Sequence, residues 1–257
     1  MNSFMKIIYC ELARSAKALG LIDLVGISSL LSVHAAPPPS AFGVWGDASF
    51  DPKNHPFLKG VACTLVWEQV ENKPGLFDWS ALDQAMDTAV GRNQFIFLSI
   101  NVGPDAPEWI YTQGVPRVET RDQIHDSWPA YPFYTSSAYK SFFQRLITEF
   151  GKHIHNYPKA KQERIVFIQV KSGCTGDECA YKGNVSDPKY DLPVKSPAWR
   201  EFRLWLFDLY VKTFQGASDH PQIALLFNNV TADDDEENGK KGGHTEEWKW
   251  VMDNEIF

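Results

Sequence analysis

The sequence has few cysteines, no dense basic segment and no zinc motif, and each absence narrows the class of protein. Four Cys are spread over 257 residues, and none is spaced with His as a zinc site requires. The formal charge of −7 and the lack of any Lys/Arg cluster predict no nucleic-acid partner. The hydrophobic share of 44% and charged share of 22% are typical of a globular chain that is long enough for one large core.

The first part of the chain differs in composition from the rest. Basic residues precede an apolar stretch from Leu21 to Val33, which is followed closely by the small residues Ala35 and Ala36. This order is typical of a signal peptide, predicted over residues 1–36, with an ordinary N-terminal helix as the alternative. The stretch is too short for a membrane span, so we expect no membrane partner. The signal peptide predicts a secreted or periplasmic location. Residues 37–41 are expected to be a spacer before a folded domain at 42–257.

Removal of that segment would leave Cys63, Cys174 and Cys179. An odd number allows at most one internal disulfide, and Cys174 and Cys179 are close enough in sequence to form it in an exported protein.

The remainder of the chain alternates buried strands with amphipathic helices. Continuous apolar runs predict strands at Phe42–Trp45, Leu58–Trp67, Phe95–Ile100, Ile165–Val170 and Ile223–Phe227. Helical spacing of apolar residues predicts helices at Ser80–Val90, Ser137–His153, Pro197–Phe214 and Glu246–Met252, the first of them capped by Ser80. Alternation of this kind predicts a parallel sheet covered by helices, either a barrel or an open doubly wound sheet.

Polar residues at the strand ends favour the barrel. The strands lead into Glu68, Asn101, Lys171 and Asn228, and Gln169 lies inside the third long strand. Barrel enzymes build their sites from the carboxyl ends of many strands. No glycine-rich phosphate loop follows a strand, which disfavours a nucleotide-binding sheet, and no G-x-S-x-G elbow is present, which disfavours an esterase.

Residues 67–83 match the pattern W-x-x-x-E-x-x-x-G-x-F-D-W-S-x-L-D. This pattern resembles a segment of clan-A glycoside hydrolases, such as the β-galactosidases of families 35 and 42. Gly103-Pro104, Pro107–Trp109 and Gly114–Arg117 are similar to the GP…EW…G-x-P segment of these enzymes. The resemblance covers residues 58–183 and implies a (β/α)8 barrel of the TIM type that hydrolyses β-glycosidic bonds in a galactoside or related polysaccharide by a retaining mechanism, with no cofactor.

A third segment carries the expected acid. After the strand at Ile165–Val170, residues 171–183 resemble the G-x-x-G-E-x-x-Y pattern around the catalytic acid of related barrels, with Asp177 inserted between Gly176 and Glu178. Glycosidic cleavage needs a carboxyl group that protonates the leaving oxygen. We expect Glu178 in this role and Asp177 as the alternative; the two acids could also bind a cation, cap a turn or be solvated.

Other residues are expected to bind the carbohydrate. Trp67 and Trp109 are candidates for sugar-stacking platforms or for core packing, and Glu71 is expected to hold its loop. Candidates for hydrogen bonds to sugar hydroxyls are Asn101, Gln169, Tyr181 and Asn228.

The expected nucleophile is missing from these segments. In retaining clan-A enzymes it lies on the seventh strand, whereas this sequence offers about five strands. A closed barrel typically needs ~250 residues, so we expect an incomplete barrel with an exposed sheet edge that is inactive by itself. The alternative function is a catalytically inactive carbohydrate-binding barrel, which needs no acid pair.

Overall fold

The computed structural model describes residues 39–47, 49–50, 52–121, 130–174, 179–216, 221–227 and 245–253. Contacts divide the chain into residues 1–33 and 34–257, and the described residues all belong to the second unit. The predicted signal peptide therefore lies outside the described residues. Within the predicted spacer, residues Pro39–Ala41 form a 3-10 helix (η2), and Ala41 is buried.

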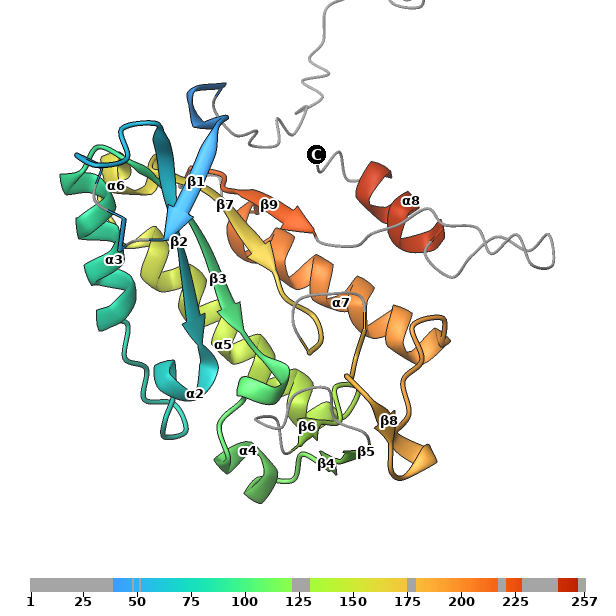
Figure 1. Cartoon of the computed structure of the whole chain (residues 1–257). Coiled ribbons are helices and arrows are strands. Elements are labelled where there is room, and N and C mark those ends of the chain that lie inside the picture. The colour runs from blue at the N-terminus through green and yellow to red at the C-terminus, as the bar shows by residue number, and fades with distance from the viewer. Residues whose placement is uncertain are drawn as a thin grey trace, which may run out of the picture. The chain divides into compact units, whose positions relative to one another are not determined.

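Five parallel strands form the main sheet in the order β1-β2-β3-β7-β9 (Figure 1). They are β1 (Val44–Asp47), β2 (Leu58–Val66), β3 (Phe95–Asn101), β7 (Ile165–Val170) and β9 (Ala224–Phe227). The four predicted long strands are confirmed. The first strand begins two residues later than predicted, because Phe42 is 71% exposed and precedes the paired segment.

The helices match the predicted ones closely. They are α3 (Ser80–Gly91), α5 (Ser137–His155), α7 (Pro197–Phe214) and α8 (Thr245–Asp253), with short helices α2 (Trp67–Val70), α4 (Trp109–Thr112) and α6 (Lys159–Gln162). The hydroxyl of Ser136 accepts from the backbone N–H of Tyr139 and caps α5. The predicted cap of α3 is wrong: Ser80 is the first helical residue, and its N–H donates to the Asp78 carboxylate at 2.9 Å.

Two small antiparallel ladders lie beyond the carboxyl ends of the strands, where they were not predicted. One pairs β4 (Arg117–Val118) with β6 (Tyr131–Pro132), and the other pairs β5 (Thr120–Arg121) with β8 (Asn184–Val185). The 3-10 helices η3 (Gly103–Asp105) and η4 (Pro188–Tyr190) complete the described elements.

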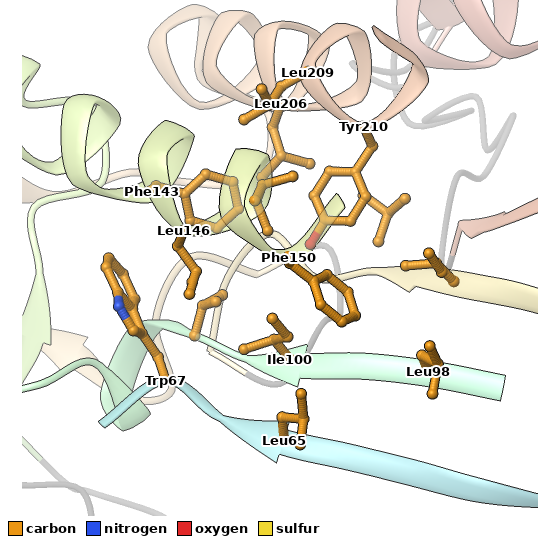
Figure 2. Close-up of a cluster of buried hydrophobic side chains, with 14 of the residues drawn as sticks. Leu65, Trp67, Leu98, Ile100, Phe143, Leu146, Phe150, Leu206, Leu209 and Tyr210 are labelled. Carbon is orange, nitrogen blue, oxygen red and sulfur yellow. The ribbon is translucent and has the colours of Figure 1, made fainter. Parts of the chain in front are cut away.

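The core lies between the sheet and the helices α3, α5 and α7. Figure 2 shows Leu65, Leu98 and Ile100 projecting from β2 and β3 toward α5 and α7. Helix α5 contributes the predicted apolar face, with Tyr139, Phe143, Leu146, Ile147, Phe150 and Ile154 all at most 1% exposed. Burial of such side chains stabilises the fold by roughly 1.5–3 kcal/mol each.

Among the described residues, the opposite face of the sheet carries no α-helix. There Phe97 and Phe167 stack with ring centroids 4.9 Å apart, and Trp45 packs against both. Gly60 is required beneath Trp45 because a Cβ atom would overlap the indole ring.

The order of the strands and the placement of the helices distinguish a barrel from an open doubly wound sheet, the two predicted architectures. The order of the strands in the sheet follows their order in the chain, and the long helices α3, α5 and α7 cover one face (Figure 1). A doubly wound sheet reverses its strand order and has helices on both faces, whereas successive right-handed crossovers in one direction leave all helices on one face. Within the described residues the sheet is therefore singly wound, as in barrels.

Candidate functional site

Parallel pairing brings the carboxyl ends of β2, β3 and β7 to one edge of the sheet. Val66 is opposite Asn101, and Leu98 is opposite Ile168, so the residues that follow these strands are neighbours. Glu68 follows β2, Asn101 ends β3, and Lys171 follows β7. Asp105 joins them from η3, four residues after Asn101.

Asp105 interacts with the other three polar side chains. Burial raises the pKa of Asp105 above its ordinary value, and the nearby carboxylate of Glu68 adds to the increase. The hydrogen bond from the Asn101 side chain and the charge of Lys171 act in the opposite direction, but burial prevails. We call Glu68, Asn101, Asp105 and Lys171 the edge cluster. It combines two carboxyl groups, an amide and an ammonium group, which can donate to and accept from a polyhydroxylated ligand.

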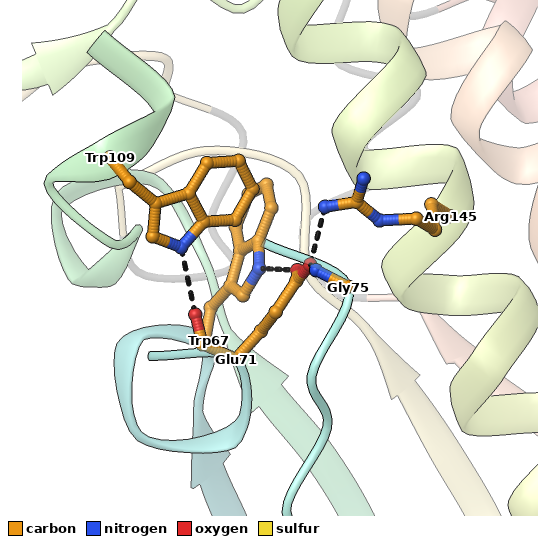
Figure 3. Close-up of polar contacts among 5 residues, drawn as sticks. All are labelled: Trp67, Glu71, Gly75, Trp109 and Arg145. Atoms are coloured by element: carbon orange, nitrogen blue, oxygen red, sulfur yellow. Dashed lines mark hydrogen bonds and ion pairs between the residues drawn. The ribbon is translucent and has the colours of Figure 1, made fainter. Parts of the chain in front are cut away.

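A buried carboxylate, Glu71, holds the loop after β2 (Figure 3). Its Oε2 accepts from Trp67 Nε1 at 3.0 Å, and its Oε1 accepts from the Gly75 backbone N–H at 2.7 Å and from the Arg145 guanidinium. Its backbone carbonyl accepts from Trp109 Nε1 at 2.9 Å. The structure therefore confirms that Glu71 holds its loop, and it also ties that loop to α4 and α5.

The two tryptophans differ in access. Trp67 is fully buried, packs edge-on against Tyr139 and Phe143, and has no exposed face for a sugar in this structure. Trp109 is half-buried, and the Arg145 guanidinium lies 5.4 Å from its ring centroid. Core packing, one of the two roles expected for Trp67, accounts for its burial.

The remaining predicted binding residues fall in separate places. Asn101 belongs to the edge cluster, and Gln169 lies half-buried on β7, two residues before Lys171. Tyr181 is 9% exposed and packs against Tyr131 and Tyr134, with no hydrogen-bond partner for its hydroxyl among the described residues.

The predicted residues Glu178, Asp177 and Asn228 lie outside the described residues, but the chain on each side of residues 175–178 is described. The backbone N–H of Cys174 donates to the carbonyl oxygen of Cys179 at 3.3 Å, and the Cys174 thiol lies 3.5 Å from the same oxygen. Cys174 is three residues beyond Lys171. The loop that carries Asp177 and Glu178 therefore leaves and rejoins the described structure at the edge where β7 ends.

Sequence reasoning missed Asp105. Asp105 follows the Gly103-Pro104 dipeptide of the segment that resembles clan-A glycoside hydrolases. Its place in a short turn directly after a strand is the sequence signal that points to this acid. No three His, Cys, Asp or Glu side chains gather as a possible metal site within the described ranges. Every helix in those ranges is too short or too polar to span a bilayer.

These observations define a singly wound parallel α/β protein with a polar cluster at the carboxyl edge of its sheet. No model of a known protein family matches the chain, and no curated protein matches it.

Two solved structures are partly similar to the chain. One is a β-galactosidase from the psychrophilic Marinomonas ef1, with 13% identity, a TM-score of 0.45, and coverage of 71% of this chain and 36% of that one. The other is a psychrophilic glycoside hydrolase family 10 endo-β-1,4-xylanase, with 11% identity, a TM-score of 0.37, and coverage of 66% and 45%. The chain spans less than half the length of either structure. Similarity at this level identifies neither the family nor the function of this chain.

Proposed function

We propose that the chain belongs to a glycoside hydrolase that cleaves β-glycosidic bonds, in a β-galactoside or a related polysaccharide, at the carboxyl edge of the sheet. The observation that carries the proposal is the edge cluster: four polar side chains from the ends of three neighbouring parallel strands, of which Asp105 and Glu68 are carboxylic acids. Barrel enzymes place their catalytic and binding groups at this edge. The resemblance of residues 67–83 and 171–183 to clan-A glycoside hydrolases, including families 35 and 42, supports the same chemistry.

Glu178 is proposed as the catalytic acid and base. Its loop is anchored beside the edge cluster by Cys174 and Cys179. In a retaining mechanism, Glu178 would first donate its proton to the leaving glycosidic oxygen and then take a proton from the attacking water. The nucleophile would come from a later strand, and Asp177 is the alternative acid.

Substrate binding is proposed at the edge cluster. Asn101 and Asp105, whose side chains interact, present an amide and a carboxyl group together, which suits a pair of adjacent sugar hydroxyls. Trp109, Gln169, Tyr181 and Asn228 are proposed around them.

A closed TIM-type barrel is the proposed complete fold. The singly wound order of the strands supports it, and so does the helix-free face with Trp45, Phe97 and Phe167, because parallel sheets are normally covered on both faces. From the N-terminal segment we also propose export to the periplasm or the medium.

The test is hydrolysis of a panel of β-glycosides by the full-length gene product and by its Glu178→Gln and Asp177→Asn variants. Loss of turnover in Glu178→Gln alone, with unchanged thermal unfolding, is the expected result. Glu201→Gln is the matched control, because Glu201 is exposed on α7 and its replacement also removes one negative charge. Undiminished turnover in Glu178→Gln would overturn the assignment, and sugar binding without turnover in the wild type would favour an inactive binding protein.

A further inference from the structure

The loops after β3 and β7 meet at two glycines. Gly103 has φ +68°, and a Cβ atom placed on it would lie 2.5 Å from the Tyr134 hydroxyl oxygen and 2.8 Å from the carbonyl oxygen of Gly173. A Cβ atom on Gly173 would overlap the carbonyl oxygen of Cys179. Only residues without a side chain allow this approach of backbone to backbone.

Each glycine leads directly to the proposed site. Gly103 opens η3, which carries Asp105 at its other end. Gly173 is followed by Cys174, whose N–H closes the hydrogen bond to Cys179. A shift at the Gly103–Gly173 junction would therefore move Asp105 relative to Cys174 and Cys179, the anchors of the loop that follows β7.

Tyr134 lies directly against this junction. Its side chain is fully buried, and its ring packs against Tyr139, Tyr181 and Trp199 at centroid distances of 5.3 to 5.4 Å. Burial, reinforced by the neighbouring Tyr139, raises the pKa of Tyr134 well above its ordinary value, so the hydroxyl keeps its proton and can donate it.

The hydroxyl of Tyr134 has no hydrogen-bond partner among the described residues. A buried polar group without a partner costs about 1–3 kcal/mol, and phenylalanine would fill the same ring site without that cost. The geometric consequence of this hydroxyl is at the junction, where it occupies the space that a side chain on residue 103 would need.

We propose that Tyr134 is a positioning residue, whose hydroxyl sets the spacing and orientation of the loops after β3 and β7 at the Gly103–Gly173 junction. The effect on catalysis rests on the proposed function, because it acts through Asp105 and the backbone of residues 171–174, which follow β7. The contact between the loops does not rest on it.

The proposal is tested by measuring kcat for two single variants, their double variant and a control. Tyr134→Phe and Gly103→Ala should each lower kcat by roughly tenfold or more, since displacements of about 1 Å can cost up to a hundredfold. Gly114→Ala is the control: Gly114 has φ +97° but nothing within 4 Å of its Cβ position, so it carries the backbone strain without the collision. Its kcat should stay within about twofold of the wild type, in line with strain of roughly 1 kcal/mol that acts on stability.

The double variant Gly103→Ala/Tyr134→Phe separates positioning from simple destabilisation. Removal of the hydroxyl relieves the shorter of the two collisions of the new methyl group and leaves the one with the carbonyl oxygen of Gly173, so the double variant should lose less kcat than the two single losses combined. Additive losses, or a Tyr134→Phe enzyme with wild-type kcat, KM and pH profile, would overturn the proposal.

A second measurement does not depend on catalysis. In Tyr134→Phe, hydrogen exchange of the Cys174 amide should accelerate about fivefold or more, while amides in the centre of β3 keep their wild-type rates. Equal acceleration throughout the sheet, or none at Cys174, would contradict the proposal. If the wild type has no glycosidase activity but exchange at Cys174 accelerates, the positioning role is supported and the proposed function fails. If the wild type is active and Tyr134→Phe changes neither kcat nor exchange, the positioning role alone is refuted.

Discussion

Replacement of Glu71 by glutamine removes one carboxylate oxygen from the buried network that holds the loop after β2 (Figure 3). The two carboxylate oxygens accept from three donors, on Trp67, Gly75 and Arg145. A glutamine side chain offers one acceptor oxygen and one amide group that can only donate. At least one donor would therefore face another donor, and the ion pair with Arg145 would be lost.

The magnitude follows from the burial of the partners. A buried donor left without an acceptor costs about 1–3 kcal/mol, and removal of one member of a buried ion pair costs about 3–5 kcal/mol. Glu71 is fully buried, but the Arg145 side chain is 35% exposed and can be solvated in part. We therefore expect Glu71→Gln to lower the free energy of unfolding by about 3 kcal/mol, which corresponds to a decrease in Tm of roughly 6–12 °C for a domain of this size.

Urea unfolding, followed by circular dichroism and tryptophan fluorescence, measures this loss. The control is Glu108→Gln, because Glu108 is 72% exposed and its pair with Arg117 lies at the surface; its change should be within about 0.5 kcal/mol. A loss below about 1 kcal/mol for Glu71→Gln would refute the reasoning, because the network would then be worth no more than one ordinary hydrogen bond.

Two further predictions concern pH. Burial alone would raise the pKa of Asp83, but hydrogen bonds from the Tyr157 hydroxyl at 2.6 Å and from His153 at 2.8 Å outweigh burial and lower the pKa. The ionised Asp83 side chain therefore stabilises the fold. This stabilisation is present above the ordinary pKa of about 3.9 and is lost as pH falls through the lowered value. Asp83→Asn should thus lower the free energy of unfolding by about 1 kcal/mol at neutral pH and leave it unchanged at low pH. The expected loss is small because the Asp83 side chain is 44% exposed. Equal losses at both pH values in urea unfolding would contradict this prediction. The pKa of Asp105 is raised, so its ionisation disfavours the fold and stability falls as pH rises from about 3.9 through the raised value. Asp105→Asn should remove that fall and leave stability at neutral pH unchanged or higher, whereas Glu201→Gln should keep it; a pH profile of unfolding that Asp105→Asn leaves unaltered would contradict the assignment.

Local sequence patterns were sufficient to predict the main strands and helices. The apolar runs of β2, β3 and β7 and the apolar face of α5 have the periods of buried strands and an amphipathic helix, and the structure places them accordingly. The ladders β4–β6 and β5–β8 carried no such signal, because each strand has two residues and its partner is distant in sequence, as with Thr120 and Val185.

The candidate site was predictable only in part. Glu68, Asn101 and Lys171 could be placed together because parallel strands end at a common edge of the sheet. The role of Trp67 could not be decided, because stacking on a sugar and packing in the core use the same side chain and differ only in burial. The junction of Gly103 with Gly173 depends on a tertiary contact over 70 residues, for which no spacing rule exists.

The most direct test of the central claim compares two β-galactosides that differ only in their leaving group, one aryl and one alkyl, with wild-type enzyme and Glu178→Gln as the full-length gene products. If Glu178 protonates the leaving oxygen, the variant should lose roughly 10²–10⁴-fold in kcat/KM on the alkyl glycoside. On the aryl glycoside, which departs without a proton, the loss should be much smaller. Equal losses on both substrates, or retained activity on the alkyl glycoside, would contradict the account.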